Sequence, residues 1–74
     1  MKEISAEQRF SVPVNNFAIS PSQDEYTLMY SADGVGFTAW TQSTPANEVL
    51  VVNNFPKNMV FYLSGNTSDV VITY

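Results

Sequence analysis

The sequence predicts an all-β fold: a small antiparallel β-sandwich or barrel with an extended N-terminal arm. Five or six short segments rich in β-branched and aromatic residues recur at intervals of roughly 8–12 residues. Turn-forming residues separate these segments, and no window has an apolar repeat at helical spacing long enough for a helix. With 74 residues, the chain has room for one domain.

The first 22 residues carry the weakest strand signal, because residues 1–8 are polar and mixed in charge. A strand-like alternation follows over residues 8–14, but Pro13 removes a backbone donor within it. A proline at that place favours an edge strand or a loosely paired extension. We therefore predict that residues 1–22 form an N-terminal arm or edge-strand segment, and that residues 23–74 form the β-sandwich domain.

A hairpin at residues 25–41 is the strongest local signal in the chain. Residues 25–31 are dense in strand formers, and residues 37–41 return as the partner strand. Between them, Asp33-Gly34 tolerates the positive φ that tight hairpin turns need. The side chains expected on one face of the first strand are Tyr26, Leu28 and Tyr30.

Four further segments complete the predicted sheets. They are residues 17–19, 48–52, 59–63 and 69–74. The continuous apolar run at 48–52 favours a strand that is buried on both faces or lies in the sandwich core. We expect the last strand to pair with its neighbours and not to fray.

Composition excludes several classes of function. The chain has no Cys and no His, which removes thiol nucleophiles, disulfides, Cys/His zinc sites and imidazole catalysis. Three basic residues stand against seven acidic ones, for a net charge of −4. This charge cannot supply the basic footprint of a nucleic-acid binder, and it disfavours anionic lipid surfaces. We expect no nucleic-acid or membrane partner, and the first residues lack the apolar run of a signal peptide.

We predict that the chain is not an enzyme and holds no cofactor or metal. Asp24 and Glu25 are adjacent, so in a strand their side chains point to opposite faces and cannot act as one acid–base pair. The sequence contains neither a calcium-binding loop pattern nor a glycine-rich phosphate loop. Asp33 and Asp69 lie at turns, where we expect them to bond the backbone; a single surface ion near either one stays open.

The polar surface is unusual, because only 14% of the residues are charged, against about 25% in an average domain. Ser, Thr and Asn supply the polarity instead, and 14% of the residues are aromatic. Such a surface suits close packing against another protein. A short chain without disulfides also gains stability from association. We therefore expect a homo-oligomer, or association with a larger surface.

Five residues are candidate partner contacts. Phe10, Val12 and Phe17 either complete the edge of the sandwich or anchor an apolar arm in a neighbouring subunit. Trp40 is either a core anchor or, at the surface, an interface hot spot or a platform for sugar stacking. Phe55 lies in a loop, where burial inside the domain is less automatic, so its exposure would point to a partner.

The hairpin Tyr26-Thr27-Leu28-Met29-Tyr30-Ser31-Ala32-Asp33-Gly34-Val35-Gly36-Phe37-Thr38-Ala39-Trp40 resembles a hairpin found in discoidin-type and fibronectin-type sandwiches. This resemblance covers about a fifth of the chain, and it recurs wherever a tight hairpin packs aromatic residues. A full discoidin domain is much longer, and its ligand-binding spikes have no counterpart here. The sugar-binding or lipid-binding function of that family is therefore not carried over to this chain.

The hairpin and the later stretch Leu63-Ser64-Gly65-Asn66-Thr67-Ser68-Asp69-Val70 together resemble small virion proteins of tailed phages, especially the crAss-like phages of Bacteroides. This resemblance spans residues 25–74. It implies an auxiliary, decoration or head-fibre protein on the capsid surface, assembled in the host cytoplasm. The implied partners are the major capsid protein or other virion subunits. Two alternatives remain, namely a carbohydrate-binding module of a receptor-binding fibre or adhesin, and a fragment of a larger fibre.

Overall fold

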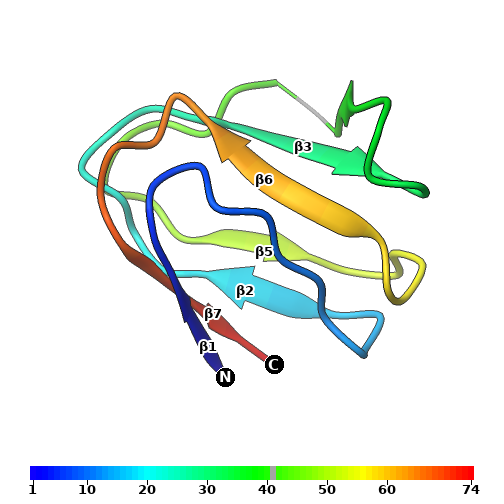
Figure 1. The fold of residues 1–74 in the computed structure, drawn as a ribbon. Helices are drawn as coiled ribbons and strands as arrows, with labels where there is room; N and C mark the ends of the chain where they lie inside the picture. The colour runs from blue at the N-terminus through cyan, green and yellow to red at the C-terminus, as the bar shows by residue number, and fades with distance from the viewer. Residues whose placement is uncertain (41) are drawn as a thin grey trace.

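The computed structural model describes residues 1–40 and 42–74, which contain seven strands and no helix. The strands form two antiparallel sheets that pack face to face, so the predicted all-β sandwich is confirmed (Figure 1). The strands are β1 (Lys2–Ile4), β2 (Phe17–Ile19), β3 (Thr27–Ser31), β4 (Thr38–Ala39), β5 (Leu50–Val52), β6 (Val60–Ser64) and β7 (Val70–Thr73).

The chain passes back and forth between the two sheets. The four-stranded sheet has the order β1-β7-β2-β5, and the three-stranded sheet has the order β4-β3-β6. Of these neighbouring pairs, β3 and β4 alone follow one another in the chain. Every other pair joins segments that are distant in sequence, and Figure 1 shows the first and last strands side by side.

The predicted hairpin is present as β3 and β4, with Met29 opposite Ala39. Gly34 has a φ of 78°, the left-handed conformation expected of this turn. The Asp33 carboxylate accepts hydrogen bonds from the backbone N–H groups of Val35 and Gly36, so its predicted role at the turn is confirmed. Thr41, the last residue of the predicted returning strand, lies outside the described residues.

Phe61 on β6 lies at the centre of the core and is fully buried. Its ring centroid lies 5.4 Å from that of Phe10, 5.2 Å from that of Phe17 and 5.5 Å from that of Phe55. The buried hydrophobic residues around it come from both sheets: Ile4, Phe10, Val12, Phe17, Ile19, Tyr26, Leu28, Val52, Leu63, Val70 and Ile72. The aromatic residues therefore meet mainly inside the sandwich.

Residues 1–22 are part of the sandwich, so the prediction of a separate arm is wrong. β2 lies inside the four-stranded sheet, between β7 and β5. Phe10 pairs with Phe61 through backbone hydrogen bonds of 2.9 and 2.8 Å. The edge-strand alternative holds for β1, which the polar composition of residues 1–8 concealed. The predicted strand at residues 8–14 is reduced to the single pair at Phe10.

β5 packs against the core with one face only, so of the two alternatives for this run, burial on both faces is wrong and a strand of the sandwich with one face in the core holds. Val52 is fully buried, whereas Val51 is 54% exposed. The reason is that the described residues form only two packed sheets, so no further layer covers the outward face of the four-stranded sheet. An apolar run alone cannot distinguish this arrangement from a strand in the core.

A network of polar residues joins the loop before β3 to the turn between β6 and β7. Asp24 accepts hydrogen bonds from the backbone N–H and the hydroxyl of Thr67, at 2.8 and 2.7 Å. The Ser22 hydroxyl bonds the side chain of Asn66, and both residues are buried. We expected Asp69 to bond this turn, but Asp24, which is distant in sequence, takes that role.

Acid is expected to weaken both carboxylate-bonded turns. Hydrogen bonds from Thr67 hold the pKa of Asp24 below its usual value of 3.8, and hydrogen bonds led by that from the N–H of Val35 lower the pKa of Asp33. A depressed folded-state pKa stabilises the fold above the unfolded-state pKa, and this stabilisation is lost as the pH falls through the folded-state pKa. Stability should therefore fall below about pH 4.

The measurement is urea unfolding of the parent protein and of the double variant Asp24→Asn and Asp33→Asn as a function of pH. We expect the double variant to be less stable than the parent near neutral pH and to lose less stability between about pH 4 and pH 2. Glu48→Gln, at an exposed residue, is the matched control and should keep the parental slope. Equal slopes for the double variant and the parent would contradict the prediction.

Candidate interaction surface

Three of the five predicted partner contacts lie in the core. Phe10, Val12 and Phe17 are only 5%, 1% and 4% exposed, so they are not available to a partner. Of the two alternatives for these residues, the apolar arm is wrong, because the rings of Phe10 and Phe17 pack edge to face at 6.5 Å and both lie against Phe61. These residues hold the two sheets together.

Trp40 and Phe55 are half-buried and pack against the core. Their ring centroids lie 6.3 Å apart at an angle of 82°, and the ring of Phe55 also lies 5.2 Å from that of Tyr30. The core-anchor alternative for Trp40 is therefore the one that the structure supports. Most of Phe55 is committed to contacts inside the domain, although it comes from a loop.

On the outer face of the four-stranded sheet, strands β7, β2 and β5 present a surface without charged side chains. In the register of β2, Ala18 lies opposite Thr73 on one side and Val51 on the other, so these three residues form one row across the sheet. In the next row, the backbone N–H of Ser20 donates to the carbonyl of Val71 at 2.9 Å. Val49 extends the same face of β5, two residues from Val51.

We call this surface the valine face and define it by six residues: Ala18, Ser20, Val49, Val51, Val71 and Thr73. Val49 and Val51 are 56% and 54% exposed, although their side chains are apolar. The alternating side chains Phe17, Ile19 and Ile72 point into the core, which fixes the outward direction of the six. The pairing register of β7, β2 and β5 therefore places these six side chains side by side on the outer face of the sheet.

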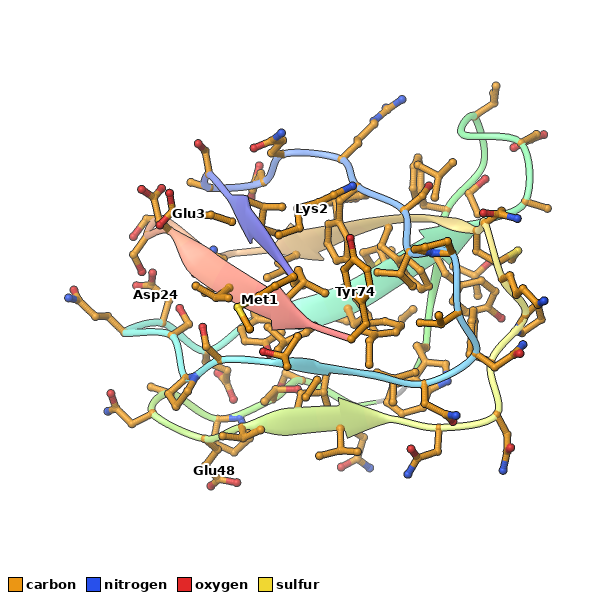
Figure 2. The ribbon with its side chains drawn as sticks, turned by 90° about the horizontal axis from the view of Figure 1, so that it is seen from below. Met1, Lys2, Glu3, Asp24, Glu48 and Tyr74 are labelled. Atoms are coloured by element: carbon orange, nitrogen blue, oxygen red, sulfur yellow. The ribbon has the colours of Figure 1, made fainter. Side chains whose placement is uncertain are left out.

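Charged residues border the valine face and do not lie on it. Glu3 lies at its β1 edge, opposite Val71. Figure 2 shows the molecule from below, with Glu3, Asp24 and Glu48 toward one side of the view and Tyr74 away from them. An exposed apolar surface with a charged rim is typical of a protein–protein contact.

The outer face of the three-stranded sheet differs, because it combines aromatic rings with a cation. The rings of Phe37 and Tyr62 pack edge to face at 4.8 Å. The Arg9 guanidinium lies 5.0 Å from the centre of the Phe37 ring, and its Nη1 donates to the Gly34 carbonyl at 3.0 Å. No local sequence pattern indicates this group, because Arg9 reaches the Phe37 ring only through the pairing of Phe10 with Phe61.

The described residues offer no group of three or more His, Cys, Asp or Glu side chains placed to hold a metal ion. Within residues 1–40 and 42–74, no pocket is present either. A search of the same residues for a helix long and apolar enough to cross a membrane was negative. The valine face and the Arg9–Phe37–Tyr62 group are therefore the surfaces from which a function can be argued.

No protein-family model, curated protein or solved structure matches this chain.

Proposed function

We propose that this chain is a structural protein of a phage particle, an auxiliary or decoration protein (or a head-fibre component) that binds the outer capsid and reinforces it. The valine face carries the proposal, because it presents Val49 and Val51 to solvent on a regular sheet surface. The resemblance of residues 25–74 to small virion proteins of tailed phages supports the location on a capsid. In this proposal the valine face replaces the N-terminal segment as the attachment surface.

The physical basis of attachment is burial of apolar surface. Full burial of a valine side chain contributes about 1.5–3 kcal/mol, so covering the exposed halves of Val49 and Val51 contributes on the order of 1 kcal/mol each. One copy therefore binds with modest affinity. Many equivalent positions on a capsid would nevertheless hold many copies, each bridging the junction between shell subunits.

The first test is sedimentation of a lysate that produces the phage on a density gradient, with mass spectrometry to locate this chain. Co-migration with megadalton particles at a fixed ratio to the major shell protein is the expected result. The copy number would then separate a decoration protein from a head fibre. Recovery only as a light species would overturn the proposal.

A lysine on β7, at the side of the valine face next to Ala18, should detach the protein from the particle. Thr73→Lys places a charge beside Ala18, and that charge would have to be buried at the contact. We expect particle occupancy to fall at least tenfold, which corresponds to about 1.4 kcal/mol. The matched control Thr73→Val keeps the face apolar and should keep full occupancy. If the lysine variant binds particles as well as the parent does, the protein attaches to the particle through a surface other than the valine face.

The alternative function, a carbohydrate-binding module of a fibre or adhesin, is favoured by the Arg9–Phe37–Tyr62 group. Aromatic rings stack on sugars, and an arginine beside them donates hydrogen bonds. Tyr62→Ala should then abolish glycan binding measured by calorimetry, while Thr73→Lys leaves it unchanged. Heat signals that are the same for Tyr62→Ala and the parent would exclude this surface.

A further inference from the structure

We propose that β5 pairs with β5 of a second copy of this chain, antiparallel and across a two-fold axis at Val51. The two four-stranded sheets would then join into one continuous sheet, with the outward-facing valines of both copies on the same surface. This dimer does not depend on the proposed function, because it uses the edge of β5, whereas capsid attachment uses the face of the sheet.

The free edge of β5 can be identified from the hydrogen bonds of its neighbour β2. The N–H of Ser20 points to β7, because it donates to the carbonyl of Val71. Backbone groups alternate in direction along a strand, so Phe17 and Ile19 point to β5, where they lie opposite Val52 and Leu50. The N–H and C=O of the residue between those two, Val51, consequently point away from the sheet.

A second contact confirms this direction. The N–H of Asn54 donates to the Asn16 side chain at 2.9 Å, on the β2 side. Because alternate residues share a direction, the N–H groups of Val49, Val51 and Asn53 all point outward. The C=O group of each of these residues points outward beside its N–H group. The exposed side chains at this edge include Val49 and Val51.

The other sheet edges carry protective features that β5 lacks. β1, at the opposite end of the four-stranded sheet, has the charged residues Lys2 and Glu3. β4 is shorter than β5, with two residues against three. β6 is covered on its outer side by the pairing of Phe10 with Phe61. Charges, short length and cover are the usual means by which proteins prevent edge-to-edge pairing.

The β5 edge is complementary to itself. An antiparallel pair centred on Val51 places Val51 opposite its own copy and Val49 opposite Asn53 of the second copy, so outward donors meet outward acceptors. Residues 49–56 carry no charge, and the two Glu48 side chains would lie at opposite ends of the pair. A two-fold contact of this kind uses the same surface on both copies and therefore closes at a dimer.

Left-handed residues limit the length of this pair. Asn47 has a φ of 66° and Asn54 a φ of 58°, so the extended stretch ends on both sides. The register centred on Val51 pairs residues 49–53 and keeps both Asn47 and Asn54 outside the paired segment. A shift by two residues would oppose Asn47 to Asn53 in one direction, or pair Val49 with Phe55 beyond Asn54 in the other. A short, closed pair of edges is the expected result.

The test is the molar mass of the purified protein from light scattering and sedimentation over a range of concentrations. We expect a dimer of twice 8.2 kDa that dissociates on dilution. Because both copies carry a net charge of −4, added salt should strengthen the dimer. The amide of Val51 should exchange its hydrogen more slowly as the concentration rises. A monomer at all concentrations, or an open series of larger species, would overturn the proposal.

Val51→Pro is the decisive variant. The N–H of Val51 points outward in the parent protein, so a proline there removes no hydrogen bond to β2. Edge strands tolerate proline at such positions. We expect dimerisation to weaken at least tenfold while the thermal unfolding of the monomer stays cooperative. Val51→Lys, which keeps the backbone donor but adds charge, is the second variant and should act in the same direction. Dimerisation of both variants at the parental strength would contradict pairing at β5.

Thr73→Lys separates this proposal from the proposed function. The residue lies on β7, two strands away from β5, so this variant should dimerise like the parent and still fail to bind particles. If it dimerises and also binds particles, the attachment surface is wrong and the dimer stands. If the parent binds particles but is a monomer in solution and shows no exchange protection at Val51, the dimer is wrong and the attachment stands.

Discussion

Deletion of residues 1–22 is expected to abolish folding of the remaining chain. The deletion removes β1 and β2, and β2 is the strand that joins β7 to β5 in the four-stranded sheet. It also removes five core side chains: Ile4, Phe10, Val12, Phe17 and Ile19. At about 1.5–3 kcal/mol for each buried side chain, the loss is on the order of 10 kcal/mol. Native domains have only about 5–15 kcal/mol of stability in total.

The measurement is the amide spectrum and the thermal unfolding of the isolated segment 23–74. We expect narrow amide dispersion and no cooperative transition. Adding a synthetic peptide of residues 1–22 should restore the amide dispersion of segment 23–74, because the missing strands can pair with it from a second chain. This control shows that the loss of folding comes from the loss of these strands. A cooperative transition of 23–74 alone would show that the first 22 residues are an accessory arm after all.

Truncation of Phe61 is expected to be the most damaging single substitution. The residue is fully buried and contacts the rings of Phe10, Phe17 and Phe55, so Phe61→Ala opens a cavity between the sheets. Such changes lower the free energy of unfolding by about 3–5 kcal/mol. For a domain of this size, each 1 kcal/mol lowers Tm by roughly 4–8 °C. The variant should therefore be largely unfolded near physiological temperature.

Thermal unfolding followed by circular dichroism measures this effect. Val35→Ala is the control, because the side chain is 83% exposed on the hairpin turn and its loss should leave Tm unchanged. Phe61→Leu, which fills most of the cavity, should lie between the parent and the alanine variant. If Phe61→Ala lowers the free energy of unfolding by less than about 1 kcal/mol, the prediction is wrong and the core closes around the missing ring.

Elements that depend on local chemistry were predictable. Asp33-Gly34 identifies the turn between β3 and β4, and the period of two along residues 26–30 identifies the inward-facing side chains. The Gly65 turn, with a φ of 97°, follows the same rule. In each case the turn or strand depends on the residues within it, so the sequence of that one segment is sufficient to predict its structure.

The candidate interaction surface was not predictable in the same way. The apolar run at 48–52 predicts a strand, but its position at the end of a sheet depends on β2, some thirty residues earlier in the chain. Exposure of Val49 and Val51 follows from this pairing, which turns their side chains to the outer face of the sheet. The buried candidates Phe10 and Phe17 illustrate the converse, because a weak local signal hid two central core residues.

The sequence by itself determined the all-β class, the turns and the absence of Cys and His chemistry, because these depend on residue identity and short-range spacing. Only the tertiary structure decided that residues 1–22 belong to the sandwich and that β5 has a free edge. Strand partners are chosen by total burial across the whole domain. Every strand offers similar hydrogen-bonding groups, so no single segment encodes its own neighbour.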